Sequence, residues 1–191
     1  MNPLRLMLAT LVAAALCVAL PRTASADTSV IKRPGAHPRY SFEAEPHLLF
    51  GAFDGPGDNQ QGWGPGFRGT VEIIDNGFIS KINNTVGIGF GADWLFYGDV
   101  CHTNNSRVRV CDKNDRFVFP VVMQWNFWLS RNWSVFGEPG LAFDIRDDKD
   151  NKLRLDPFVF YAGGRFHFND SVALTMRAGW PTFSVGASFF L

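Results

Sequence analysis

The stretch that decides the fold is VGIGFGADWLFY, residues 86–97, in which apolar residues alternate with small or polar ones. Successive side chains of a β-strand point to opposite faces, so this alternation predicts a strand with one apolar face. We interpret its glycines as residues that make room inside a sheet rather than as a phosphate-binding loop. The apolar set is Val86, Ile88, Phe90, Ala92, Trp94 and Phe96, and the other set is Gly87, Gly89, Gly91 and Asp93.

The same alternation recurs along the chain, and no stretch after residue 39 shows a helical period. Each run is close to the roughly 9–11 residues that a tilted strand needs to cross a bilayer. The sequence therefore predicts an all-β fold, an antiparallel up-and-down transmembrane β-barrel of about eight strands over residues 40–191. The expected strands are Tyr40–Phe53, Gly66–Ile74, Val86–Tyr97, Arg116–Leu129, Trp133–Asp144, Leu155–Phe168, Ser171–Gly179 and Thr182–Leu191.

The predicted connections differ in length, as they do in a membrane barrel with short turns on one side and long loops on the other. Two connections depart from that rule, because Asp75–Thr85 is long where a turn is expected and Trp180–Pro181 is short where a loop is expected. The other connections are tight turns at Ser130–Asn132 and Asn169–Asp170, and long loops at Asp54–Pro65, Gly98–Asp115 and Ile145–Arg154.

Residues 1–26 have the parts of a secretory signal peptide. Arg5 supplies a positive charge, Leu6–Leu20 is apolar, and Ala24-Ser25-Ala26 provides a cleavage site. The apolar run is shorter than the roughly 20 residues of a spanning helix, so cleavage after Ala26 is expected, with an uncleaved anchor as the alternative. Residues 27–39 are polar and contain proline, and we expect them to form a short, poorly ordered periplasmic leader.

Composition predicts which face of the barrel points outward. The chain has 19 Phe, 6 Trp and 3 Tyr, and the interior of an eight-stranded barrel is just wide enough for its own side chains, so the aromatic face is too bulky to fill it. The aromatic face must therefore point outward, where water would make it aggregate but lipid would cover it. A secreted soluble barrel that binds a small apolar ligand is the alternative, and it predicts the reverse facing of every strand. The 18 basic and 18 acidic residues balance, which argues against a nucleic-acid partner.

The last strand carries the most specific local signal. Ser184 is followed by Gly186, and hydrophobic residues stand at the third-last and last positions, Phe189 and Leu191. Together with the alternating runs, these residues resemble the small eight-stranded outer-membrane barrels of the OmpA/OmpX type, although that family usually ends in Phe. The resemblance implies residence in the outer membrane of a Gram-negative bacterium, contact with its lipid, and recognition of the last strand by the barrel-assembly machinery.

The inward positions of the predicted strands carry charges of both signs. Buried charges are costly unless they are paired, so we predict a salt-bridge network that plugs the lumen, with a narrow ion or proton path or a catalytic cluster as the alternatives. The predicted network comprises Glu43, Glu45, His47, Arg68, Glu72, Asp93, Glu138, Arg165 and Arg177, and Gln124, Asn126 and His167 face the same way.

Two cysteines of the mature chain, Cys101 and Cys111, lie in the Gly98–Asp115 loop. Export places them in an oxidising compartment, where a disulfide is the expected state. Closing a loop of about 11 residues, it would contribute about 3 kcal/mol on the chain-entropy model. A metal site is not expected, because the pair lacks C-x-x-C spacing and a fourth ligand.

No catalytic set or cofactor motif emerges from the sequence. The lipid A deacylase family places a His and a Ser two residues apart on one strand, but Asn169 stands where the serine would follow His167, and an amide is not a nucleophile. We therefore expect a non-enzymatic outer-membrane protein with a structural or surface-interaction role, whose external loops, chiefly Gly98–Asp115, meet a surface partner. A lipid A-modifying enzyme on the same barrel is the alternative, and no cofactor is expected.

Overall fold

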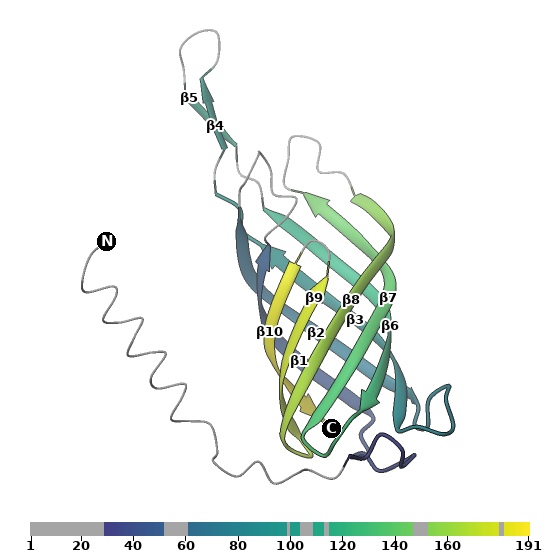
Figure 1. Cartoon of the computed structure of the whole chain (residues 1–191). Helices are drawn as coiled ribbons and strands as arrows, with labels where there is room; N and C mark the ends of the chain where they lie inside the picture. The colour runs from purple at the N-terminus through teal and green to yellow at the C-terminus, as the bar shows by residue number, and fades with distance from the viewer. Residues whose placement is uncertain are drawn as a thin grey trace, which may run out of the picture.

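The barrel is closed by its first and last strands. The computed structural model describes residues 29–51, 61–98, 100–103, 109–112, 115–146, 153–179 and 182–191. Eight antiparallel strands follow one another in the order β1-β10-β9-β8-β7-β6-β3-β2, and β1 pairs with both β10 and β2 (Figure 1). The predicted all-β, eight-stranded barrel is therefore confirmed. Its strands are β1 Phe42–Gly51, β2 Gly62–Ile74, β3 Asn84–Leu95, β6 Arg116–Trp128, β7 Trp133–Arg146, β8 Leu153–Asn169, β9 Val172–Gly179 and β10 Thr182–Phe190.

A small hairpin lies outside the barrel ladder. Its strands, β4 Val100–Thr103 and β5 Arg109–Asp112, form a separate two-stranded sheet inside the connection predicted as the Gly98–Asp115 loop. Figure 1 shows this hairpin projecting from the end of the barrel opposite the C-terminus. We call that end the loop end, and we call the end that holds the C-terminus the leader end. The hairpin places Cys101 directly opposite Cys111, as a bridge between them requires, and the bridge itself stays a prediction.

The start of β2 was predicted four residues too late, because Gly62–Pro65 was assigned to a loop. Glycine and proline in this segment hide the alternation that marks a strand. The glycines have a packing reason, since a Cβ on Gly64 would lie 1.7 Å from the Trp94 carbonyl oxygen and one on Gly62 would lie 2.7 Å from the Tyr97 ring. The strand therefore continues where only a bare backbone fits against its neighbour.

β8 carries a β-bulge near Pro157. Gly140 pairs with Val159 while Ala142 pairs with Asp156, so β8 contains one more residue than β7 between these pairs. An extra residue reverses the alternation. Leu155 precedes the bulge and Phe158 follows it, three residues later. Both are therefore exposed on the outer face, at 54% and 74%.

The large apolar side chains of the strands face outward and the charged side chains face inward, as predicted. Phe50, Phe90 and Phe160 are 46–50% exposed on the outer face, whereas Glu45, Arg68 and Glu138 on the inner face are at most 2% exposed. The soluble-barrel alternative predicted the reverse and is contradicted. One outward residue is buried: Val86 faces outward with its ladder partner Trp125 but is only 1% exposed. Its β6 neighbour Trp125 contacts Phe78 of the connection between β2 and β3, which folds back over this part of the surface.

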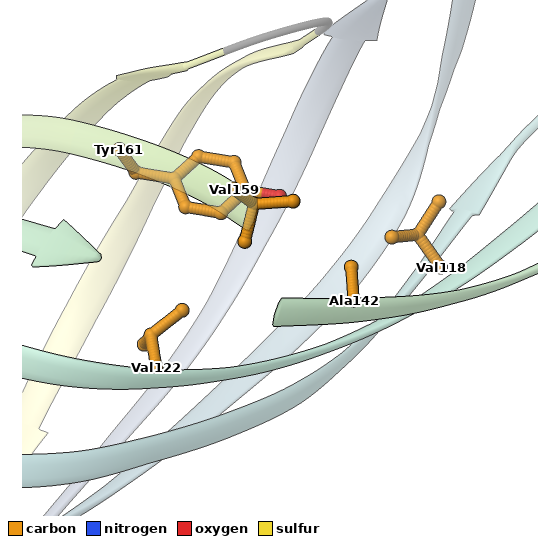
Figure 2. Close-up of a cluster of buried hydrophobic side chains, with 5 residues drawn as sticks. All are labelled: Val118, Val122, Ala142, Val159 and Tyr161. Carbon is orange, nitrogen blue, oxygen red and sulfur yellow. The ribbon is translucent and has the colours of Figure 1, made fainter. Parts of the chain in front are cut away.

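The interior is filled in layers. Toward the loop end lie a buried Arg116–Asp144 ion pair of 2.7 Å and a group of apolar side chains, five of which, from β6, β7 and β8, are shown in Figure 2. Leu49, Leu95 and Tyr97 form a second apolar cluster toward the same end. Charged side chains fill the middle, and aromatic rings fill the leader end. The five residues of Figure 2 are Val118, Val122, Ala142, Val159 and Tyr161.

The described part of the leader, residues 29–39, has a defined conformation and lies against the barrel (Figure 1). The Val30 amide donates to the Leu129 carbonyl at 3.0 Å, and the Asn83 amide donates to the Ile31 carbonyl at 2.7 Å. Val30 is 5% exposed. The expectation of poor order was therefore wrong for these residues, because the leader exchanges backbone hydrogen bonds with two barrel connections.

Candidate functional site

Arg177 on β9 is the centre of the charged interior. Its Nη1 and Nη2 donate to Glu45 on β1 at 2.7 and 2.8 Å, a bidentate pair, and its Nε donates to Glu138 on β7 at 2.9 Å. All three side chains are at most 2% exposed. They meet because each occupies an inward position of its strand, and the closed barrel brings these three strands around one lumen.

The network continues toward β2 and β3. Arg68 Nη1 lies 3.5 Å from Glu138 Oε2, and Arg68 Nη2 lies 3.6 Å from Asp93 Oδ2. His47 lies between two carboxylates, with Nε2 at 3.0 Å from Asp93 and Nδ1 at 3.4 Å from Glu45. Each of these carboxylates and guanidinium groups therefore has an opposite charge within 4 Å.

A second ion pair lies nearer the leader end. Arg165 Nη2 is 2.7 Å from Glu43 Oε1, and Ser188 donates to the same oxygen at 2.7 Å. The Arg165 guanidinium lies 4.2 Å from the centre of the Phe136 ring, a cation–π contact. Arg165 also donates to Asn126, whose amide reaches Glu138 through Gln124. Hydrogen bonds thus join this pair to the rest of the network.

We call these residues the charged layer. A buried ion pair is tolerated when its geometry is good and its remaining polar atoms are hydrogen-bonded. The contacts of Arg177 and the Glu43–Arg165 pair have that geometry, whereas Nε of Arg68 and Nε of Arg165 have no hydrogen-bond partner among the described residues. The layer's side chains and those of the apolar clusters toward the loop end are buried inside the barrel. Its members are Glu43, Glu45, His47, Arg68, Asp93, Glu138, Arg165 and Arg177.

Glu72 is the one predicted network residue that the structure places elsewhere. It pairs with Gly87 in the ladder and its amide donates to the Ser41 carbonyl, so it lies at the leader end rather than beside the charged layer. One of its carboxylate oxygens is buried with no hydrogen-bond partner among the described residues. Alternation gave the correct face, but the height along the barrel depends on strand register, which alternation does not specify.

A buried serine–histidine pair was missed by sequence reasoning. Ser134 Oγ on β7 lies 2.9 Å from His167 Nε2 on β8, because Ser134 and Arg165 are ladder partners. Both side chains are inside the lumen, at 0% and 2% exposure. His167 Nδ1 has no hydrogen-bond partner among the described residues, so no acid orients the imidazole. A nucleophile needs such an oriented base and access for its substrate, and this pair has neither.

His37 of the leader closes the interior at the leader end. Its Nδ1 hydrogen-bonds to Asn83, its Nε2 lies 3.0 Å from Asp75, and its ring stacks on Trp128 with centroids 5.6 Å apart. Trp128 in turn lies 4.7 Å from the His167 ring. A cavity of about 310 Å³ adjoins this stack. It is lined by Ala36, His37, Pro38, Trp128, Ser130, Arg131 and Asp170. His37 lay in the presumed leader, and no sequence signal distinguished it.

The predicted assembly residues occupy both faces of β10. Ser184 points inward and is 4% exposed, whereas Phe189 and the terminal Leu191 are 41% and 70% exposed. A Cβ on Gly186 would lie 2.6 Å from the Pro46 carbonyl oxygen, so glycine allows β10 to approach β1 closely at the closing seam. These positions leave Phe189 and Leu191 available to another molecule, and their role in assembly stays a prediction.

No grouping of three or more metal-ligating side chains occurs among the described residues. Within that part of the chain, no helix is long and apolar enough to span a membrane. The fold and the charged layer together define a closed eight-stranded β-barrel with an apolar exterior and a charged interior.

Comparisons with known proteins give solved structures of transmembrane barrels. A de novo designed transmembrane β-barrel has 13% sequence identity and a TM-score of 0.47, with 84% of this chain and 99% of that chain covered. Ail, the attachment invasion locus protein of Yersinia pestis, solved with the heparin analogue sucrose octasulfate, has 13% identity and a TM-score of 0.43 over 79% and 97% of the two chains. No protein-family model and no curated protein matches the sequence.

Proposed function

We propose that this protein is an integral β-barrel of a Gram-negative outer membrane, with a structural or surface-interaction role and a plugged lumen. The observation that carries the proposal is the inverted facing of the barrel. Large apolar side chains such as Phe67, Phe90 and Val121 are 41–46% exposed, while arginine and glutamate fill the inside. Water would penalise such a surface, whereas a bilayer requires it.

The height of the apolar surface agrees with a bilayer. On β6, Phe117 and Phe127 lie ten residues apart on the outer face, each beside another aromatic ring, at 5.1 and 4.8 Å between centroids. At a rise of about 3.4 Å per residue and a tilt of about 40°, they are about 26 Å apart along the barrel axis. That height matches the band of about 25 Å between the aromatic girdles of outer-membrane barrels.

The burial and pairing of the inward side chains support a plugged lumen. Ion conduction through the barrel would require water between residues that now touch, and the charged layer is bonded from β1 across to β7, β8 and β9. An enzymatic role has no comparable support, since the buried Ser134–His167 pair lacks an orienting acid among the described residues. We therefore propose that the protein acts without catalysis.

The surface role is assigned to the loop end. The β4–β5 hairpin projects there, opposite the leader and the C-terminus (Figure 1). The signal peptide predicted over residues 1–26 would bring the chain to the periplasm, and insertion from that side leaves the leader end in the periplasm and the hairpin outside the cell.

Cell fractionation and gel mobility test the proposal. We expect the protein in the outer-membrane fraction, a shift in mobility between unheated and boiled samples, and surface labelling of a tag in the β4–β5 hairpin. Planar bilayers containing the refolded protein should show no steady conductance. Recovery in the soluble periplasmic fraction would refute the membrane assignment, and a stable conductance step would refute the plug alone. Lipid A mass spectra from cells with and without the protein should be identical.

A further inference from the structure

The connection between β2 and β3, residues 75–83, is longer than a periplasmic turn needs to be. Its conformation is defined by hydrogen bonds to a buried side chain. Asn84 is fully buried, and its side-chain amide donates to the carbonyls of Ile79 and Ile82, both at 2.8 Å. Gly77 has a φ of +46°, and a Cβ there would lie 1.9 Å from Asn84 Oδ1. The fold of the connection therefore depends on one asparagine and one glycine.

The connection is fastened to the outer surface of the barrel. Asn84 Oδ1 also accepts a hydrogen bond of 2.9 Å from Trp125 Nε1, and the Phe78 ring meets the Trp125 ring edge-on at 5.5 Å. Trp125 lies 4.8 Å from Phe127, so the contact falls within the aromatic girdle of the leader end. Figure 1 shows the connection projecting sideways from the base of the barrel.

The connection exposes two large apolar side chains, Phe78 and Ile79, beside the polar side chains of Asn76, Ser80 and Lys81. Phe78 and Ile79 are 55% and 41% exposed, and Ile73 at the end of β2 is 56% exposed. Exposed apolar area costs about 25 cal/mol per Å² in water, which a polar turn would avoid. Because Phe78 is continuous with the lipid-facing girdle through Trp125, the partner that this surface fits is lipid.

We infer that residues 75–83 form a foot that inserts Phe78 and Ile79 into the lipid interface beside the barrel, on the periplasmic side. This inference rests on the proposed function, since it requires the barrel to span the membrane. The foot holds the leader end at a fixed depth, and apolar side chains at such an interface lie about 5–10 Å into the boundary between headgroups and acyl chains. The exposed Lys81 on the same connection reaches the headgroups with its ammonium group.

Site-specific fluorescence tests the depth of the foot. Single cysteines replace Phe78, Phe90 or Arg131 in the full mature chain carrying Cys101→Ser and Cys111→Ser, and each is labelled with an environment-sensitive dye. The proteins are refolded into phosphatidylcholine vesicles without quencher, with lipids that carry a nitroxide near the headgroup, or with lipids that carry it in the middle of the acyl chain. The headgroup nitroxide reports on position 78 and the mid-chain nitroxide on position 90. Phe90 is a lipid-facing control on β3, and Arg131 is an exposed turn residue at the leader end.

The dye at position 78 should emit at shorter wavelength than the dye at position 131 and be quenched by the headgroup nitroxide. If position 78 instead behaves like position 131 while position 90 is quenched by the mid-chain nitroxide, the foot is refuted and the membrane barrel stands. If position 90 is not quenched by the mid-chain nitroxide, the membrane barrel fails and the foot fails with it. Ile79→Cys repeats the measurement if Phe78→Cys does not give a heat-modifiable barrel.

Discussion

Arg177→Met would remove the cation that joins Glu45 to Glu138 and leave both carboxylates in the lumen. Removing one partner of a buried ion pair costs about 3–5 kcal/mol of folding free energy. Arg177 donates four hydrogen bonds of 2.7–3.2 Å to these two residues. Without it, Glu138 keeps Gln124 at 2.9 Å and Arg68 at 3.5 Å, whereas Glu45 keeps His47 at 3.4 Å. Because Glu45 loses its only guanidinium contact among the described residues, we expect the free energy of unfolding to fall by an amount near the upper end of the range of about 3–5 kcal/mol.

The assay is urea unfolding of the protein refolded in vesicles, followed by tryptophan fluorescence and by the mobility of unheated samples. The matched control adds Glu45→Gln and Glu138→Gln to Arg177→Met, which removes the charges together with their partner. A neutral replacement of a buried ion pair is often no less stable than the pair, so the control should recover most of the loss. A cost below about 1 kcal/mol for Arg177→Met, as for an exposed pair, would show that the lumen is hydrated and refute the plug.

Three further changes test other parts of the structure. Phe90→Arg puts a charge on a 46% exposed outward position and should lower the free energy of unfolding by about 2–4 kcal/mol if the site lies at mid-bilayer; an unchanged urea midpoint would contradict a lipid-facing Phe90. Gly64→Ala should greatly reduce the heat-modifiable band, because its Cβ would lie 1.7 Å from the Trp94 carbonyl oxygen; a normal folding yield would contradict that close approach. His37→Ala removes contacts with Asn83 and Trp128 and should make the leader protease-sensitive at a cost of about 1–3 kcal/mol; unchanged cleavage of the leader would show that His37 does not hold it.

Alternation was sufficient to predict the barrel and its facing, because both depend on a period that each strand displays by itself. Val86 faces outward as predicted but is buried, because the connection between β2 and β3 covers this part of the surface. The strand boundaries were less predictable. Gly62 and Gly64 show no alternation although they lie in β2, and the β4–β5 hairpin consists of strands of four residues each, too short to display a period.

The pairing within the charged layer could not be predicted in the same way. Glu43 and Arg165 are 122 residues apart, and Glu45 and Arg177 are 132 apart, so their contact depends on the register of strands that the sequence does not give. Because the register was unknown, Glu72 was wrongly included in the network and the Ser134–His167 contact was not predicted. The sequence alone predicts which residues face inward. The height of each residue along the barrel axis is known only from the strand register of the closed barrel.

The layout of the ion pairs connects them to closure of the barrel. Glu43, Glu45 and His47 all come from β1, and the arginines bound to the two glutamates come from β8 and β9 at the other end of the chain. In an open sheet β1 would keep only β2 as a neighbour, and Glu43 and Glu45 would lack those arginines. Once β1 pairs with β10, all three strands surround one lumen and the charges are neutralised. Since unpaired charges in a lipid or protein interior are strongly unfavourable, the charged layer stabilises the closed barrel relative to an open sheet. The ion pairs therefore favour the correct first-to-last strand pairing in addition to filling the lumen.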